Sequence, residues 1–484
     1  MIKKILFMNS ISQDPSDRFF GWPTSLLYAI APTIEAIKEG KLLLDYVPQI
    51  FDPIWYVEGV NSEDIKRKFQ EEIESVDIIC ASATYDSLYP TVQLFSEAKK
   101  QNPRTITILG GPHFDETHNT ILNDVNLNPQ IIDFGIAGDG EDALKALLEI
   151  IAKESLSDFN PSNLPGEAWI YSTKGRYETS RKPINLDELP FMPIELVDEF
   201  RHKHDFDIFS DESGILPTIQ MIAQRGCRYS CNFCSERKDL AYPNARSIDS
   251  ILEEIELRKQ QGFKAIFFDD STLGLYPNIV ELLKELEKTG MTFGSLNRFN
   301  HLTNQKIVEE YRKAGFKYVY CAIEQFDDNA LKEMKKAQKV KQIAQSMEVL
   351  SQNGFIVGVS LLYGLPYESE DTITATLDFT QEWVERGVIR LISESLLSYH
   401  LATPIGKNKH LNFNRTPPNL GFPFNRFEEG QWYHSNHVTA PYLEKILEKS
   451  EARFKNQMIR NRHSWYAQQG YVIDANTKPQ TSES

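Results

Sequence analysis

The sequence predicts an α/β protein with two successive sheets of mainly parallel strands. Short apolar runs alternate with amphipathic segments from the start of the chain to about residue 155. The same alternation resumes at about residue 215. A chain of 484 residues also exceeds what one hydrophobic core usually organises. We therefore expect an N-terminal doubly wound, Rossmann-like domain, a central partial (β/α)6 TIM-like barrel and a small mixed C-terminal region.

In the first region, domain 1–155, hydrophobic periodicity places the elements. Strands are expected at 4–8, 42–47, 77–81, 105–109 and 131–136. Helices are expected at 62–76, 88–101 and 140–153, where apolar residues recur at three- and four-residue spacing. Ligands of such sheets bind at the carboxyl ends of the strands. Polar and Gly-rich sequence follows three of these strands, at 82–85, 110–113 and 138–141.

Region 156–212 breaks this rhythm and is expected to be a hairpin followed by a linker. Residues 168–179 resemble a hairpin closed by Lys174 and Gly175. The run from Asn185 to Pro193 is expected to be extended, because residues before prolines avoid the helical conformation.

The barrel is expected at 213–400, from six consecutive strand-and-helix units. Its strands are predicted at 218–224, 265–268, 292–296, 318–323, 355–362 and 389–396. The chemistry of such barrels sits at the carboxyl ends of the strands. His400 lies where the barrel should end and is a candidate to face the active site.

Region 401–484 loses the alternation and is expected to be a substrate-side or capping region, with a disordered polar tail from about Asp474. His434 and His437 lie in an aromatic-rich stretch and could bind substrate or transfer protons, since imidazole titrates near neutral pH. A surface or packing role for both is the alternative.

Composition argues against a nucleic-acid or membrane partner. Lys and Arg total 52 against 68 Asp and Glu, and the formal net charge of -16 repels phosphates. No stretch approaches the roughly 18 apolar residues of a membrane span, and the N-terminal apolar run is too short for a secretory signal. We therefore expect a cytoplasmic protein.

Three of the five cysteines, Cys227, Cys231 and Cys234, directly follow the first barrel strand. Such a loop can direct three thiolates at one inorganic centre, one fewer than a closed cluster or structural zinc site requires. A four-iron four-sulfur cluster would leave one iron open to the amino and carboxylate groups of a methionine-type ligand. The alternative is a zinc site completed by a distant His or by Cys321. Cys321 and Cys80 otherwise read as small buried hydrophobes.

The run Cys227-x-x-x-Cys231-x-Phe233-Cys234 resembles the signature loop of the radical S-adenosylmethionine (SAM) enzymes. This resemblance implies a [4Fe-4S] cluster on the three cysteines and SAM as its ligand. Further positions similar to family residues that lie near the SAM amino group, carboxylate, ribose or adenine are Asp269, Asp270, Arg298, Glu324, Gly364 and Pro366. The family pattern Glu-Ser-Gly is replaced here by Glu324-Gln325-Phe326, which puts the local backbone geometry in doubt.

The first region resembles the cobalamin-binding domain fused to one large radical SAM subgroup. The similarity rests on the runs 100–103, 109–113, 132–133, 138–141 and 186–193. It implies that cobalamin is held by Ser82, Thr84, Tyr85, Gly110, Gly111, Pro112, His113, Gly138, Gly140 and Glu141. The Asp-x-His-x-x-Gly loop of many cobalamin domains is absent, so no histidine lower ligand is expected. A degenerate domain without corrin is the alternative.

The resemblance implies a cobalamin-dependent radical SAM C-methyltransferase. A 5'-deoxyadenosyl radical would abstract hydrogen from an unactivated carbon of a small metabolite or natural-product intermediate, and methylcobalamin would deliver the methyl group. An external flavodoxin- or ferredoxin-like protein would supply electrons. The alternatives are a non-methylating rearrangement or cyclisation and a cobalamin or iron-sulfur sensor. A methylthiotransferase is disfavoured, because no second cysteine trio precedes Cys227.

Overall fold

A computed structural model of the chain forms two compact units, the first made mainly of residues 1–204 and the second mainly of residues 205–399. The residues it describes are 3–9, 23–42, 46–52, 62–83, 88–111, 114, 131–153, 169–172, 175–177, 184–199, 208–234, 244–365, 367–397, 403–405, 445–446, 449–450 and 452–454. His400, His434, His437 and the tail from Asp474 lie outside the described residues.

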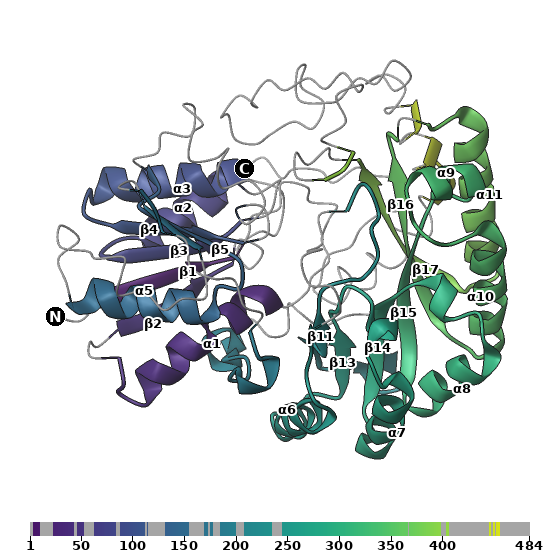
Figure 1. The fold of residues 1–484 in the computed structure, drawn as a ribbon, viewed down its shortest axis with the longest axis horizontal. Coiled ribbons are helices and arrows are strands. Elements are labelled where there is room, and N and C mark those ends of the chain that lie inside the picture. Colours follow the sequence, from purple (N-terminus) through teal and green to yellow (C-terminus); the bar gives the residue numbers. More distant parts are fainter. Residues whose placement is uncertain are drawn as a thin grey trace. The chain divides into compact units, whose positions relative to one another are not determined.

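The first unit is a doubly wound sheet, as predicted. Its strand order is β2-β1-β3-β4-β5-β6-β7, and the first five strands are parallel. These are β1 (Lys3–Met8), β2 (Tyr46–Phe51), β3 (Ile78–Ser82), β4 (Ile106–Gly110) and β5 (Phe134–Ala137). Helices α1 (Thr24–Lys38) and α5 (Glu141–Lys153) pack together on one face, and α2 (Ser62–Glu72) and α3 (Leu88–Gln101) on the other (Figure 1).

One strand of this sheet was predicted in the wrong place. The strand expected at 42–47 lies at Tyr46–Phe51 instead. Leu42 lies in the turn after α1, where it is buried and its backbone N–H donates to Ala36 O at 3.2 Å. Pro48 lowers the strand propensity of the true segment, but an edge strand such as β2 tolerates proline.

The predicted hairpin at 168–179 is present and continues the first sheet. Strand β6 (Trp169–Ser172) pairs antiparallel with β5 and with β7 (Gly175–Tyr177). It follows β5, which begins at Phe134 rather than at the expected residue 131.

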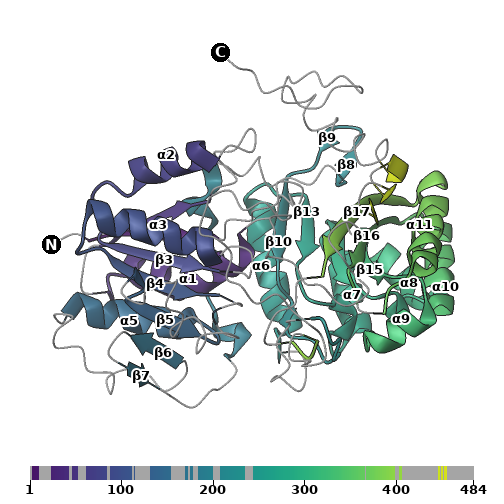
Figure 2. The ribbon, with the colours of Figure 1, turned by 90° about the horizontal axis from the view of Figure 1, so that it is seen from above.

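The second unit contains the predicted six-stranded parallel sheet, in chain order. Its strands are β10 (Thr218–Met221), β13 (Ala265–Phe268), β14 (Thr292–Asn297), β15 (Phe316–Glu324), β16 (Ile356–Tyr363) and β17 (Ile389–Leu396). Helices α6 (Ile248–Gln260), α7 (Ile279–Thr289), α8 (Gln305–Lys313), α9 (Asp328–Glu333), α10 (Val340–Gln352) and α11 (Glu370–Glu385) lie on its outer side (Figure 2). In the described residues, β10 and β17 are the two edges, so the barrel is partial.

The amino end of this barrel is filled with apolar side chains. Phe209 and Leu216, which flank the small hairpin of β8 (Ser210–Asp211) and β9 (Gly214–Ile215), pack on Phe267 and Tyr318. Because this end is a packed core, polar chemistry has room only at the opposite, carboxyl end of the strands.

Parts of the C-terminal segment pack on the outer side of the barrel. Lys445 pairs with Glu370 at 3.0 Å and Arg453 with Asp378 at 2.5 Å, both on α11. Phe454 is fully buried, and Ser450 donates to Glu394 on β17. The described stretches of residues 445–454 therefore cover the α11 side of the edge strand β17.

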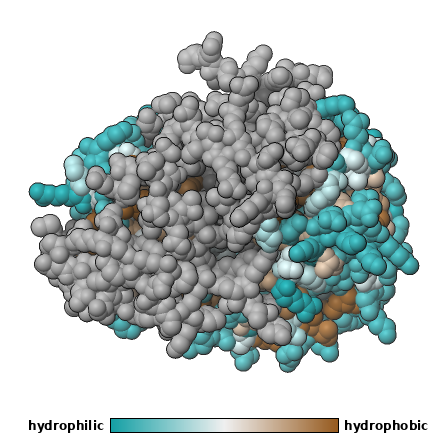
Figure 3. Space-filling view, turned by 45° about the horizontal axis from the view of Figure 1, so that its top comes forward, coloured by the Kyte–Doolittle hydropathy of each residue, from teal (hydrophilic) through white to brown (hydrophobic). Residues whose placement is uncertain are grey.

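The visible surface of the outer barrel helices is mostly hydrophilic (Figure 3). In the part of the chain that the structure describes, none of the helices combines the length and apolar character needed to traverse a bilayer.

Candidate active site

The three predicted cluster cysteines follow β10, at the carboxyl end of the barrel. Cys231 is buried, whereas Cys227 and Cys234 are partly exposed, and none of them is in a disulfide. The loop begins and ends at a neck, which we define as β11 (Gln224–Arg225) paired antiparallel with β12 (Asn244–Ala245). The predicted strand 218–224 thus stops at Met221, and its last residue belongs to the neck.

The donor set fits an iron-sulfur cluster. Within the described residues, no three His, Cys, Asp or Glu side chains converge where a single metal ion would fit. A cluster takes each thiolate on a different iron atom and therefore does not require three donors around one ion. Cys321, the proposed fourth zinc ligand, is fully buried on β15, and burial raises the pKa of its thiol.

Asp270 braces the neck from one side. Its Oδ1 accepts the backbone N–H of Ala223 at 2.9 Å and of Gln224 at 2.6 Å, and its Oδ2 is buried without a hydrogen-bond partner among the described residues. Burial raises the pKa of Asp270 to about 8, and the charge of Asp269 adds to this. This places Asp270 under the cysteine loop as a structural acceptor.

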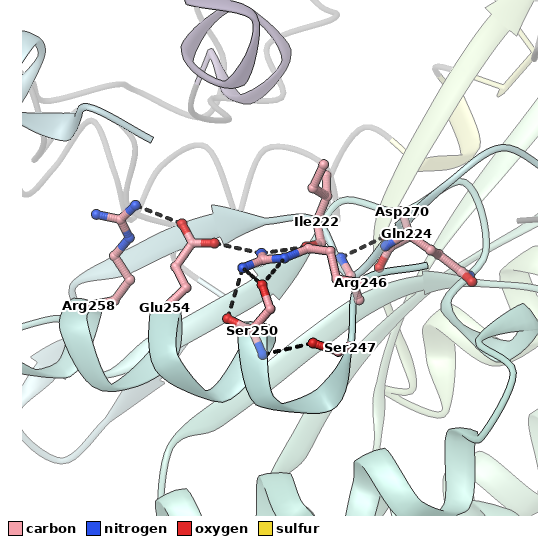
Figure 4. Close-up of polar contacts among 9 residues, drawn as sticks. Ile222, Gln224, Arg246, Ser247, Ser250, Glu254, Arg258 and Asp270 are labelled. Atoms are coloured by element: carbon pink, nitrogen blue, oxygen red, sulfur yellow. Dashed lines mark hydrogen bonds and ion pairs between the residues drawn. The ribbon is translucent and has the colours of Figure 1, made fainter. Parts of the chain in front are cut away.

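Arg246 braces the neck from the other side, inside a buried ion network (Figure 4). Its backbone N–H donates to Ala223 O at 2.9 Å, and its Nη1 donates to Ile222 O at 3.0 Å and to Glu254 at 2.6 Å. Glu254 also accepts from Arg258 at 2.7 Å. These residues could not be predicted from the sequence, because Glu254 and Arg258 on the helix α6 resemble ordinary surface charges and Arg246 precedes that helix.

We expect the stability of the wild type relative to Asp270→Asn to fall as pH rises from about 4 to about 8. An unfolded Asp releases its proton near pH 3.8, whereas folded Asp270 keeps it until about pH 8. Unfolding in this window therefore releases a proton, and rising pH favours it. Urea unfolding of both proteins at several pH values measures the difference. A difference that does not change with pH would contradict the raised pKa.

Tyr229, within the cysteine loop, is held by the corner after β14. Its hydroxyl lies 2.6 Å from His301 Nε2 and accepts from Asn300 Nδ2 at 2.9 Å. Burial, together with the charges of Arg298 and Arg228, lowers the pKa of His301 to about 4. His301 is therefore neutral near pH 7, and its Nε2 can accept a hydrogen bond from the Tyr229 hydroxyl.

Asn232, also in the loop, is held by the segment that follows α9. Its backbone N–H donates to Met334 O at 2.9 Å, and its Nδ2 donates to Glu333 O at 2.7 Å. The same segment has two non-glycine residues at positive φ, Lys335 at 54° and Ala337 at 52°. Such conformations persist only where surrounding contacts enforce them. Sequence analysis gave this segment no role, since it has no glycine to signal its turns.

Glu324 lies at the carboxyl end of β15 in a strained turn. Its φ is 61°, and the Gln325 N–H donates to Ile323 O across it. Its carboxylate accepts from Lys336 Nζ at 2.6 Å and from Ser360 Oγ at 3.3 Å. Both partners of the Lys336–Glu324 pair are buried. Lys336 was not predicted as a site residue.

Gln325 replaces the serine of the family pattern and joins two strand ends. Its Nε2 donates to Leu362 O at 3.2 Å and to Glu368 Oε2 at 2.6 Å. The same Glu368 oxygen accepts the N–H of Gly364 at 2.9 Å. The turns after β15 and β16 are thus tied together through Gln325 and Glu368. Pro366 lies outside the described residues.

The predicted pair Asp269 and Asp270 divides into two roles in the structure. Asp269 is partly exposed, and side-chain alternation along β13 puts it on the same inward face as Phe267. Asp270 is buried in the brace described above. Asp269 is therefore the better candidate for a ligand contact. Phe233, also predicted, has its ring centroid 5.7 Å from Lys336 Nζ.

In the first unit, several predicted residues gather at the carboxyl edge of the sheet. Gly111 has φ of 99°, and a Cβ there would lie 2.5 Å from Ala83 N, so only glycine fits. Gly110 O accepts the N–H of Ala83 at 2.8 Å, next to Ser82. Gly138 and Gly140 directly precede the buried Glu141, which begins α5. Thr84, Tyr85, Pro112 and His113 lie outside the described residues.

The carboxyl edge of the first sheet suits a ligand that is bound mainly by backbone groups. In the strand order 2-1-3-4-5, the connections change direction between β1 and β3, where open α/β sheets bind ligands. Asn9 follows β1 there and donates to the buried Asp52 at 2.9 Å. Neither residue was predicted, since a single Asn or Asp after a strand is an ordinary loop residue.

Asp133, in one of the runs that resemble cobalamin domains, lies at the opposite edge of the sheet. It precedes β5 and accepts from Lys99 at 2.7 Å and from the N–H of Thr107 at 2.8 Å. These contacts join α3, β4 and the start of β5. The role of Asp133 in the structure is therefore to hold the sheet together at its amino edge.

The comparisons agree with this architecture. Residues 221–380 match the Radical SAM superfamily. An uncharacterized methyltransferase of Pyrococcus horikoshii is 24% identical over 312 residues, which are 63% of this chain and 64% of that protein. The anaerobic magnesium-protoporphyrin IX monomethyl ester cyclase of Rubrivivax gelatinosus is 24% identical over 347 residues, 69% of this chain and 59% of that protein. The matched region spans less than two thirds of either relative.

A solved structure shares the fold across both units. The radical SAM methyltransferase TsrM of Kitasatospora setae, with cobalamin and a [4Fe-4S] cluster bound, has a TM-score of 0.60 at 16% identity, and the match covers 86% of this chain and 78% of that one. With the three-cysteine loop at the end of β10 and the family match over residues 221–380, the barrel region of this chain is a radical SAM domain, and it follows an N-terminal Rossmann-like domain in the sequence.

Proposed function

We propose that this chain is a cobalamin-dependent radical SAM enzyme that methylates an unactivated carbon of a small metabolite or natural-product intermediate. The observation that carries the proposal is the three-thiol loop, braced at the carboxyl end of a partial barrel that follows, in the sequence, a sheet of order 2-1-3-4-5. When bound, the cluster would supply one electron to SAM, and cobalamin would carry the methyl group.

The chain's own residues divide this work. Cys227, Cys231 and Cys234 would hold the cluster, while Asp269 and Glu324 present carboxylates at the carboxyl end of the barrel, where SAM would bind. Ser82, Gly110, Gly111, Gly138 and Gly140 would bring backbone close to the corrin. We propose the same division of the chain as from sequence: cobalamin domain to residue 155, hairpin and linker to 212, barrel to 400 and capping region beyond. An external flavodoxin- or ferredoxin-like reductant belongs to this proposal.

The relatives favour methyl transfer and also supply a second candidate. TsrM and the Pyrococcus horikoshii relative are described as methyltransferases, which supports methylation. The cyclase from Rubrivivax gelatinosus matches 69% of this chain at the same identity, which favours radical cyclisation as the second candidate. Methyl transfer and cyclisation differ in whether SAM is also consumed as a methyl donor.

We expect the wild-type protein, reconstituted anaerobically with iron, sulfide and hydroxocobalamin, to form 5'-deoxyadenosine from SAM and reductant. Cys231→Ser should lose this product, because the cluster would lack a thiolate. Cys80→Ala is the matched control, since Cys80 is a buried cysteine on β3 in the other unit. Product is measured by liquid chromatography and mass spectrometry.

The outcomes separate the parts of the proposal. Wild type that forms no 5'-deoxyadenosine overturns the radical SAM activity, and failure to retain corrin through gel filtration overturns the cobalamin part. S-adenosylhomocysteine formed with substrate supports methyl transfer. A product without an added methyl group, formed without S-adenosylhomocysteine, would instead support cyclisation.

A further inference from the structure

Arg298 makes an unusual set of contacts next to the buried cysteine of the loop. Its Nη1 donates to Cys231 Sγ at 3.7 Å, its Nε donates to Asn300 Oδ1 at 3.3 Å, and its Nη2 donates to Lys336 O. Its guanidinium carbon lies 3.8 Å from the centre of the Tyr229 ring. The residue is 8% exposed, so all three guanidinium nitrogens act inside the protein.

These contacts join the two segments that hold the cysteine loop. One segment is the corner Arg298–His301, which binds Tyr229, and the other is the stretch from Glu333 to Ala337, which binds Asn232. Cys231 lies between Tyr229 and Asn232 in sequence. Arg298 therefore links these two segments beside Cys231.

The charge of Arg298 distinguishes it from the other buried cations of this unit. Arg246 and Arg258 share Glu254, and Lys336 pairs with Glu324. Among the described residues, no Asp or Glu forms an ion pair with Arg298. A buried cation is costly unless an anion compensates it. The group that lies beside the Arg298 guanidinium is the sulfur of Cys231, which would carry negative charge as a ligand of the cluster.

We propose that Arg298 is a positioning residue for the iron-sulfur cluster: it fixes Cys231 and offsets the negative charge of the cluster, which favours the reduced state. The inference rests on the proposed function, and it differs from the expected contact of Arg298 with SAM. Hydrogen bonds and charge near the sulfurs set the reduction potential of such clusters.

The test compares three variants of the full-length reconstituted protein. Arg298→Gln removes the charge, and Arg298→Lys keeps it. Arg386→Gln is the matched control, because Arg386 also lies over an aromatic ring, at 3.7 Å from Trp383, and pairs with Glu348 on the protein surface. Iron and sulfide content, the electron paramagnetic resonance spectrum and the midpoint potential are measured without substrate.

We expect Arg298→Gln to have about a tenfold lower ratio of reduced to oxidised cluster at a fixed potential, a shift of about 59 mV for one electron. Arg298→Lys should shift less, and Arg386→Gln should match the wild type. If Arg298→Gln loses iron, retention of iron by Arg298→Lys would support the charge effect, because the positive charge would then be what keeps the cluster bound. Iron loss from both variants, with unchanged thermal unfolding, would support only the fixing of Cys231 and overturn the charge effect.

Two further results would overturn the inference while leaving the proposed function intact. One is a loaded Arg298→Gln cluster with the wild-type potential and iron content. The other is an unchanged potential with weakened SAM binding, which would assign Arg298 to SAM directly. A wild-type protein that takes up no cluster would instead contradict the proposed function.

Discussion

Replacing Glu254 by Gln is expected to lower the free energy of unfolding by about 3–5 kcal/mol. Glu254 is fully buried, and its two oxygens accept from Arg246 and Arg258 at 2.6 and 2.7 Å. A neutral amide would leave two buried guanidinium groups without a counter-charge. Removing one partner of a buried ion pair costs far more than the pair itself contributes, because the remaining charge stays out of water. Urea unfolding followed by circular dichroism measures the loss.

The matched control is Glu285→Gln on α7. Glu285 pairs with Lys288 at 2.6 Å, but Lys288 is largely exposed, so we expect a change within about 0.5 kcal/mol. Since Arg246 also binds Ile222 at the neck, Glu254→Gln should bind less iron after reconstitution as well. If Glu254→Gln lowered the free energy of unfolding no more than Glu285→Gln does, Arg246 and Arg258 would have found other partners or water, and the prediction would be wrong.

Replacing Lys336 by Met is the second large effect, also expected at about 3–5 kcal/mol. The substitution leaves Glu324 buried without its cation, at a residue whose backbone is already strained. The double variant Glu324→Gln with Lys336→Met should recover part of the loss, because neither charge remains. The single variants Lys336→Met and Glu324→Gln, the double variant and the wild type form a double-mutant cycle, measured by urea unfolding.

The exposed pair Lys313 and Glu310, at 2.7 Å, provides the control cycle for Lys336 and Glu324. Its coupling should be about 0.5 kcal/mol or less. Equal coupling in the two cycles would mean that water reaches the Lys336–Glu324 pair. Strong coupling would show that the strained turn at Glu324 and the segment after α9 depend on each other.

The sequence predicted the fold well wherever periodicity was clear. Apolar runs of four to eight residues located the barrel strands, and the 3.6-residue period located α3 and α5. The strand at 42–47 was predicted in the wrong place because the buried Leu42 packs just after α1, while the true edge strand contains Pro48. Alternation indicates which residues are buried, but it does not say which element buries them.

The residues of a local sequence motif could be predicted, whereas the residues that join the site through long-range contacts could not. Cysteine spacing marked the loop, but nothing local marked Arg246, Glu254 or Lys336, because charged residues on amphipathic helices and in turns are usually solvated. The motif marked Asp270 as a candidate ligand contact, but it does not indicate that Oδ1 of this residue accepts two backbone N–H groups.

The neck of the cysteine loop has a practical consequence for preparing the protein. Its two strands are joined by backbone pairing and by Arg246, and Asp270 holds the first of them; none of these contacts involves a thiol. Small zinc domains, by contrast, fold only when the metal binds. The barrel of this chain can therefore keep its shape through a purification in air that strips the iron, and the cluster can be rebuilt afterwards in a glove box without refolding.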